Sequence, residues 1–109
     1  MPRSSPDAFS HPELLSGFIR LHVLLHATAG GLTGAWMIEE LRHHGYRISS
    51  GTLYPMLHAL ERKGYLESSR HREGRKLWRA YKTTALGEEA LAESKQRLKE
   101  LFRELIELK

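Results

Sequence analysis

The last quarter of the chain carries an apolar stripe that a domain of this size cannot bury alone. Its positions alternate at intervals of three and four, which is the spacing of a coiled-coil seam: Leu91, Ser94, Leu98, Leu101, Leu105 and Leu108. A helix over residues 85–109 would be roughly 37 Å long at about 1.5 Å per residue, which is more than so small a domain can cover. We therefore expect a partner chain to cover the rest of the stripe, with Phe102 beside it.

Length and composition limit what the rest of the chain can be. With 109 residues, of which 40% are hydrophobic and 28% charged, the sequence indicates one globular domain. It contains no cysteine, which excludes disulfides and thiolate metal sites and suits a reducing compartment. We find neither a signal core nor an apolar run of about 18 residues, so we expect a cytoplasmic protein without a membrane span. Aspartate occurs once and the glutamates lie mostly near lysine and arginine, so we predict no catalytic residues and no enzyme.

Turn and cap signals divide the chain into an N-terminal arm over residues 1–10, a domain over residues 11–83 and a C-terminal helix over residues 84–109. Within the domain, apolar periodicity predicts three helices, and strand propensity predicts short strands over residues 65–69 and 76–82 with a polar connection between them. This is the element order of a winged helix-turn-helix, whose third helix enters the DNA major groove. The expected fold class is α+β, mostly α, with the last helix serving dimerisation.

Caps and glycines set the expected ends of the three helices. The first begins at His11 or Pro12, behind a capping box of Ser10 and Glu13, and ends at Gly30 and Gly31. The second runs from a Thr33 cap to Gly45, and the third runs from residues 49–52 to Gly64.

The third helix has two different faces. Its apolar positions are Leu53, Met56, Leu57 and Leu60. Tyr54, His58 and Arg62 follow one another at intervals of four and lie on the other face. The start of this helix offers free N–H groups and the hydroxyls of Ser50 and Thr52, which can hold a phosphate. The sequence predicts that the DNA-contacting residues of this helix are Ser50, Thr52, Tyr54, Pro55, His58 and Arg62. An ordinary capped core helix is the alternative.

The predicted hairpin carries an excess of positive charge that equals the net charge of the whole chain. The net charge is +4, and residues 64–82 hold six Lys or Arg against two acids. The basic residues assigned to the wing are Arg70, His71, Arg72, Arg75 and Lys76. Many basic hairpins are only solvated tips, but a wing beside a recognition helix usually lies on the DNA backbone or in the minor groove. We expect double-stranded DNA as the partner of this segment.

Three segments resemble the PadR family of bacterial transcriptional regulators. Residues 51–55 read Gly-Thr-Leu-Tyr-Pro, like the family's G-T-L-Y-P, and residues 57–66 resemble its L-x-x-L-E-x-x-G-L pattern, with Tyr65 between the glycine and the last leucine. Residues 81–87 match its Y-x-L-T-x-x-G pattern, with Thr83 where leucine is usual. At residues 32–37 the family's L-H-G-Y-E-L lacks its His and Tyr. The resemblance covers about residues 18–108 and is to the compact subgroup with a single C-terminal helix.

The resemblance implies a function and an assembly. PadR proteins dimerise through their first and last helices, which implies dimer contacts at Leu91, Leu98, Leu101, Phe102, Leu105 and Leu108. It also implies a homodimeric repressor on a pseudo-palindromic operator, relieved by a small-molecule effector near the dimer interface. No cofactor is expected.

Two alternatives remain at this point. His22 and His26 have the i, i+4 spacing that brings two imidazoles to one metal ion, which would make the protein a metal-responsive regulator on the same scaffold. The sequence shows no third ligand nearby, and we expect His43 and His44 to be surface residues. The second alternative is a winged helix that binds protein. Trp36 and Trp78 are expected in the core.

Overall fold

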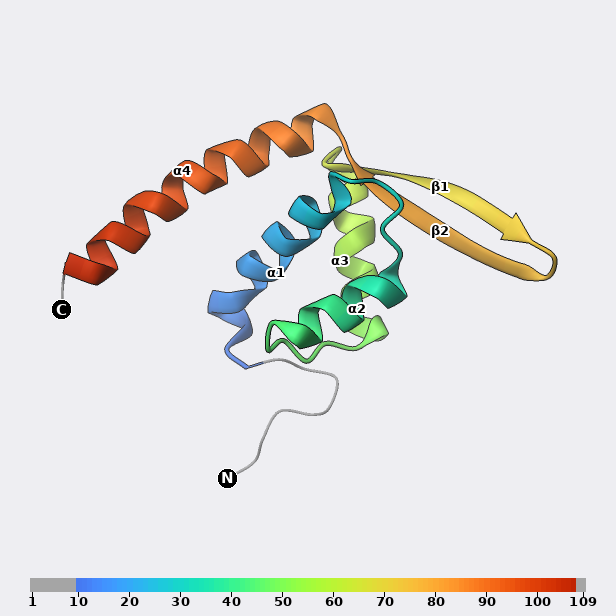
Figure 1. Ribbon diagram of the computed structural model, residues 1–109, viewed down its shortest axis with the longest axis horizontal. Helices are drawn as coiled ribbons and strands as arrows, with labels where there is room; N and C mark the ends of the chain where they lie inside the picture. The colour runs from blue at the N-terminus through green and yellow to red at the C-terminus, as the bar shows by residue number, and fades with distance from the viewer. Residues whose placement is uncertain (1–9, 108–109) are drawn as a thin grey trace, which may run out of the picture.

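The structure, a computed structural model, describes residues 10–107 and consists of four helices and one antiparallel hairpin (Figure 1). The elements in chain order are α1 (Pro12–Ala27), α2 (Gly34–His43), α3 (Ser50–Arg62), β1 (Leu66–Glu73), β2 (Lys76–Thr83) and α4 (Ala85–Glu107). This is the element order that the sequence predicts. Apart from Ser10, the predicted N-terminal arm lies outside the described residues, and so does Leu108.

Helix α1 begins at Pro12, as predicted, but its cap and its C-terminal end differ from the prediction. Its N-cap is His11, in the left-handed conformation at φ 50°, and no side chain caps the helix. The expected capping box of Ser10 and Glu13 is therefore wrong. The helix ends at Ala27, before the two glycines, because the N–H of Gly30 donates to the Ala27 carbonyl at 3.0 Å and turns the chain away. The Thr28 hydroxyl donates to the Leu25 carbonyl at 2.7 Å and supports this turn.

Helices α2 and α3 begin and end where their caps predict. The Thr33 hydroxyl accepts from the N–H of Trp36 at 3.2 Å, as an N-cap should. Gly45 and Gly64 follow the two helices at φ 91° and 90°, a conformation that glycine adopts without steric cost. Pro55 lies inside α3. It has no N–H, so it donates no hydrogen bond to a carbonyl of the first turn of that helix.

The core lies between the three N-terminal helices and the base of the hairpin. The largest fully buried side chains are Tyr81, Ile19, Met37, Leu41, Leu53, Leu57, Leu66 and Val23. Tyr81 also joins the hairpin to the segment before α2, because its backbone N–H and C=O pair with those of Leu32 at 2.7 and 3.1 Å. Burial raises the pKa of the Tyr81 phenol above its usual value, so this side chain is neutral. The hairpin is thereby anchored in the core at one end.

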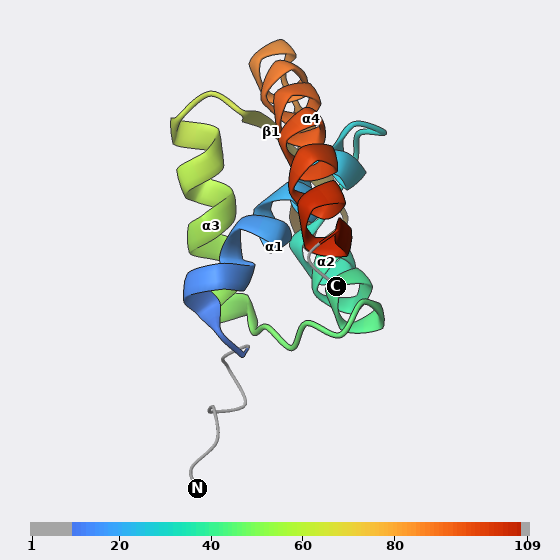
Figure 2. The same cartoon turned by 90° about the vertical axis from the view of Figure 1, so that its left-hand side faces the viewer.

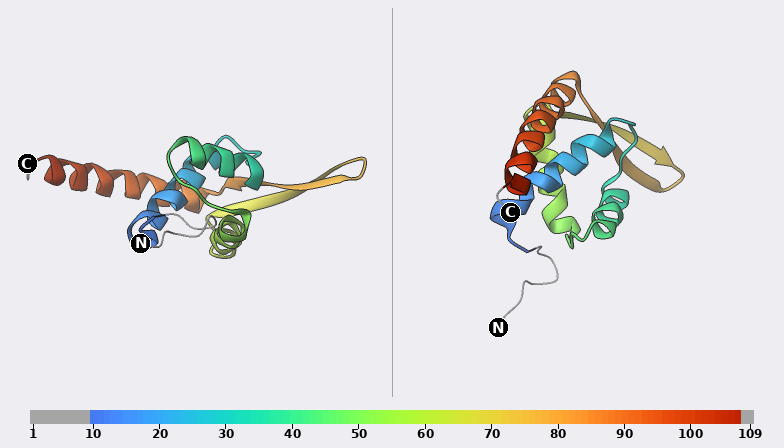
Figure 3. Two further views of the ribbon diagram at one scale, coloured as in Figure 1. Left: turned by 90° about the horizontal axis from the view of Figure 1, so that it is seen from below. Right: turned by 60° about the vertical axis from the view of Figure 1, so that its left-hand side comes forward.

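The hairpin is longer and more regular than predicted. The ladder runs without a break from Leu66 opposite Thr83 to Glu73 opposite Lys76. Only a two-residue turn remains, and Gly74 supplies the positive φ of 64° that such a tight turn requires. The expected polar connection over residues 70–75 is therefore wrong, because Arg70 and Arg72 lie within β1. From the helical body the hairpin extends as a wing, on the side opposite α4 (Figure 3).

Helix α4 is held at its start and extends away from the body after it. The hydroxyl of Thr83 donates to the Leu24 carbonyl at 2.7 Å, and that of Thr84 to the Gly64 carbonyl at 2.5 Å. Gly87 is buried there, and its N–H donates to the Thr84 hydroxyl at 3.0 Å. Leu91 packs against the core. Beyond this point the helix crosses α1 and continues outward (Figure 2). None of the described helices is long and apolar enough to span a membrane.

Candidate nucleic-acid interface

Helix α3 separates its two faces as the spacing predicts. The four apolar residues Leu53, Met56, Leu57 and Leu60 are buried. On the other face Ser50, Tyr54, Pro55, His58 and Arg62 are exposed, and Thr52 is half-buried in the first turn. The core position of the apolar face fixes the rotation of the helix about its axis. One exposed row of polar and aromatic side chains results.

Tyr54 is exposed, but its ring also rests on the start of α2. A Cβ placed on Gly34 would lie 2.5–2.6 Å from three atoms of the Tyr54 side chain, two ring carbons and the hydroxyl oxygen. Only a glycine at that position allows the ring to lie where it does. The side chain remains 37% exposed. The two helices of the helix-turn-helix thus meet through Tyr54, which the sequence predicted only as a surface residue.

A groove of about 470 Å³ joins the start of α3 to the wing. Its walls include Tyr54 from α3, Thr33 and Gly34 from the start of α2, and Lys76 and Arg79 from β2. The predicted recognition helix and the predicted wing therefore border one surface. That arrangement suits a partner which follows both elements, as a DNA duplex does.

The wing presents its basic side chains to solvent. Arg70, His71, Arg72, Arg75 and Lys76 are all exposed. Residues directly opposite each other in an antiparallel ladder point to the same face. Arg70 lies opposite Arg79 and Arg72 lies opposite Leu77, so these side chains share one face of the hairpin. Within residues 10–107 no ion pair engages a basic residue of the wing. The described residues therefore leave these basic side chains without an ion-pair partner.

On the other face of the wing, one aromatic residue, Trp78, holds neighbouring side chains in place. The rings of His71 and Trp78 stack at 5.4 Å with an interplanar angle of 15°. Lys76 Nζ lies 5.9 Å from the centre of the Trp78 ring, and the Ser69 hydroxyl lies 2.9 Å from His71 Nε2. Trp78 is half-buried by these contacts and lies outside the core, contrary to the prediction. The hairpin extends beyond the helical body, so the ring of Trp78 packs against side chains of the wing and not against the core.

An apolar groove of about 560 Å³ lies between α1 and α4. Phe18, Leu21 and Leu25 of α1 line it from one side, and Leu91 and Leu98 of α4 from the other. Further along α4, three of the predicted dimer residues are exposed: Leu101, Phe102 and Leu105. Ile106, which the heptad spacing does not include, is exposed beside them. Its own chain therefore covers the outer part of the described stripe only in part.

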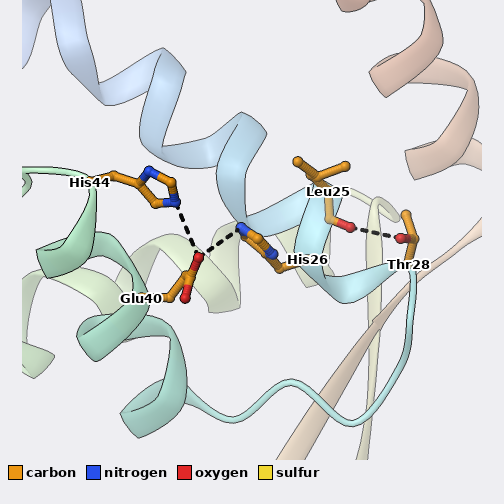
Figure 4. A network of polar contacts seen from close by, with 5 residues as sticks. All are labelled: Leu25, His26, Thr28, Glu40 and His44. Carbon is orange, nitrogen blue, oxygen red and sulfur yellow. Dashed lines mark hydrogen bonds and ion pairs between the residues drawn. The ribbon is translucent and has the colours of Figure 1, made fainter.

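The predicted histidine pair belongs to a larger cluster. The ligand nitrogens of His22 and His26 on α1 and of His44, the C-cap residue of α2, all lie within 4.8 Å of one another. Glu40 Oε2, from α2, lies 3.1 Å from His44 Nε2 and 3.6 Å from His26 Nε2 (Figure 4). Burial, followed by the nearby His44 and His26, lowers the pKa of His22 below its usual value. His44 is exposed as expected, but its membership of the cluster was missed.

Trp36 is also placed differently from its prediction. It is 49% exposed, and its ring meets that of His26 edge-on at a centroid distance of 5.5 Å. The short α2 buries Met37 and Leu41 instead. The position of Trp36 on that helix turns its ring toward the histidine cluster.

Comparison with known proteins agrees with this architecture. The model of the "Transcriptional regulator PadR-like family" matches residues 23–93. The chain is 46% identical over 88 residues to Transcriptional regulator Rv3488 of Mycobacterium tuberculosis, which covers 81% of this chain and 82% of that protein.

Solved structures show the same fold. A PadR family transcriptional regulator from Eggerthella lenta matches with a TM-score of 0.79 at 30% identity, over 88% of this chain and 85% of that one. A PadR-like regulator from Bacillus cereus has a TM-score of 0.79 at 22% identity, over 88% and 95% of the two chains. The predicted fold, a winged helix with a long C-terminal helix, is confirmed. The chain belongs to the PadR-like family of transcriptional regulators.

Proposed function

We propose that the protein is a homodimeric repressor that binds a pseudo-palindromic DNA operator through α3 and the wing. One observation carries this proposal. The exposed row of α3 and the basic wing, whose cations have no ion-pair partner among the described residues, border the same groove. The row supplies hydrogen-bonding side chains at the spacing of a helix face. The wing supplies cationic groups to the phosphate backbone.

In this proposal the residues of α3 contact different parts of the DNA, according to their chemistry. Ser50 and Thr52 lie in its first turn, where backbone N–H groups and hydroxyls hold a phosphate. His58 and Arg62 lie further along the exposed face and can reach base edges. Tyr54 is held on Gly34, so its ring and hydroxyl reach the DNA in a fixed direction.

The dimer forms through α1 and α4 in this proposal. The apolar groove between these helices and the exposed leucines of α4 present a surface that a second copy can bury. Two-fold symmetry then presents two α3 helices to successive major grooves, about 34 Å apart. Repression follows from occupation of the operator. A small-molecule effector near this interface relieves repression by changing the separation of the two recognition helices.

Selection of bound fragments from the protein's own genome tests this function. The expected result is a set of sites that share an inverted repeat. Fluorescence anisotropy with one such site then gives the salt dependence of binding, and a steep negative slope is expected because phosphate contacts release counterions. Fragments without a shared repeat, or a flat slope, would contradict the proposal and favour a winged helix that binds protein.

A further inference from the structure

The three clustered histidines come from two helices whose crossing brings their nitrogens together. His22 and His26 are one turn apart on α1, and their rings are parallel within 7°. The ring of His44, from the end of α2, lies 4.7 Å from that of His22 and 6.4 Å from that of His26. None of the three histidines lines the groove between α3 and the wing.

The distances within the cluster suit a tetrahedral metal ion. Two donors bound to one zinc ion at about 2.0–2.1 Å with tetrahedral angles lie about 3.3 Å apart. Glu40 Oε2 lies 3.1 Å from one imidazole nitrogen and 3.6 Å from another, which brackets this separation. The three histidine nitrogens lie within 4.8 Å of one another, so a pair must approach by at most about 1.5 Å to reach this separation.

The chemistry of the donors indicates the class of ion. Imidazoles with one carboxylate prefer zinc and its neighbours among the divalent transition metals, whereas calcium and magnesium require oxygen ligands. Among the described residues, Nδ1 of His22 is also a buried side-chain nitrogen without a hydrogen-bond partner. Such groups are rare in folded proteins and require an explanation. Coordination of this Nδ1 to an ion would supply one.

The cluster is accessible to an ion from solvent. The side chain of His44 is 45% exposed, and those of His26 and Glu40 about half as much. No main-chain rearrangement is needed to open a path.

We propose that His22, His26 and His44, with Glu40 as the fourth donor, bind one divalent transition-metal ion of the zinc class per chain. The ion ties the C-terminal half of α1 to the end of α2. His22 also lines the apolar groove between α1 and α4. Metal binding therefore fixes the first helix of the helix-turn-helix to the helix that forms one wall of this groove.

Calorimetric titration of the full chain, without a histidine tag, with Zn²⁺ tests the site. One ion per chain is expected, and Co²⁺ should give the visible absorption of a tetrahedral complex. His26→Ala and His44→Ala should each weaken binding at least about tenfold. His43→Ala is the matched control, because His43 is an exposed neighbour of His44 outside the cluster and its loss should leave affinity unchanged.

Tryptophan fluorescence gives a second readout that locates the ion. The chain has two tryptophans, so Trp78→Phe leaves Trp36, whose ring meets His26 at 5.5 Å, as the reporter. Zn²⁺ should change its emission with the same midpoint as the calorimetric titration. The His44→Ala variant keeps its fold, because the replaced side chain is at the surface, and circular dichroism checks this. Absence of Zn²⁺ binding, binding that survives both alanine variants, or equal loss in His43→Ala would overturn the proposal.

Discussion

At the scale of single residues, Tyr54 belongs both to the fold and to the surface. Its ring rests on Gly34 at the start of α2, and its exposed part borders the groove that leads to the wing. A side chain held in this way loses little rotamer freedom when it binds a partner. Its removal should therefore affect binding more than stability.

Tyr54→Ala is expected to lower affinity for the operator about 5- to 150-fold, because a good contact to DNA contributes about 1–3 kcal/mol. The free energy of unfolding should fall much less than in the control Leu57→Ala, where loss of a fully buried leucine costs about 2–5 kcal/mol. Anisotropy titrations and urea denaturation measure the two quantities. Equal losses of stability in the two variants would make Tyr54 a core residue and contradict its assignment.

Gly87→Ala is expected to destabilise the protein by about 1–3 kcal/mol, although alanine is the better helix former by about 1 kcal/mol. A Cβ at this position would overlap the Tyr65 carbonyl and the methyl group of Thr83, and the backbone cannot move aside cheaply. Gly51→Ala is the control, because a Cβ there meets only the Ser49 hydroxyl oxygen at 3.6 Å. A thermal midpoint of Gly87→Ala above that of the parent chain would contradict this expectation and show that the start of α4 is loosely attached.

Periodicity predicted which residues of one helix share a face, but it could not predict contacts between elements. The exposure of Tyr54, His58 and Arg62 follows from the leucine positions on the same helix. The approach of His44 to His22, by contrast, depends on how α1 crosses α2, and no spacing in the sequence encodes that crossing.

At the scale of elements, the capped helices were the most predictable and the hairpin the least. Thr33 and the glycines after α2 and α3 act through neighbours within a few residues, so local sequence is enough. The extent of the wing depends on pairing across the hairpin. Its ladder extends through residues that look like a polar loop, because Gly74 permits a two-residue turn. The longer wing carries its arginines farther from the body.

Substitution of the wing residues Arg70, Arg72 and Arg75 by alanine should weaken binding to all DNA sequences to a similar degree. The slope of log affinity against log salt should become shallower by about 0.9 for each phosphate contact that is lost. The reason is that these cations have no acidic partner within the described chain. Anisotropy titrations at several salt concentrations give the slope.

The control for the wing variant removes the same charge elsewhere, through Arg42→Ala, Arg97→Ala and Arg103→Ala. Arg42 and Arg97 are already paired with Glu39 and Glu93, and Arg103 is on α4. If this variant flattens the slope as much as the wing variant does, the effect belongs to net charge and the wing does not contact phosphates.

At the scale of the whole molecule, two long elements leave the helical body in opposite directions (Figure 1). The wing carries the positive charge, whereas the outer part of α4 carries exposed apolar side chains. In the proposed function each of them binds a partner, and the chemistry of the two partners differs. A positively charged surface attracts nucleic acid, whereas an exposed apolar surface is buried against another apolar surface. The heptad spacing of α4 is enough to predict the second requirement, because it places the leucines on one side of a helix that is longer than the body it leaves.

Leu101→Glu is expected to raise the dissociation constant of the dimer at least about 100-fold. The leucine is 47% exposed in the single chain, so its replacement should leave the fold of the monomer intact. In a symmetric dimer the substitution occurs twice, and each lost leucine burial costs about 1.5 kcal/mol or more. Operator affinity should fall with dimerisation, because a monomer contacts only one half-site.

Gln96→Glu adds the same charge about 140° around α4, at 3.6 residues per turn, and should leave assembly and operator binding unchanged. Sedimentation at several concentrations compares the two variants with the parent chain, which we expect to be a dimer at micromolar concentration. A parent chain that sediments near 12.5 kDa would refute the dimer. If Leu101→Glu is monomeric and still binds the operator as tightly as the parent, α4 serves assembly without contributing to DNA recognition, and the proposed use of two half-sites is wrong.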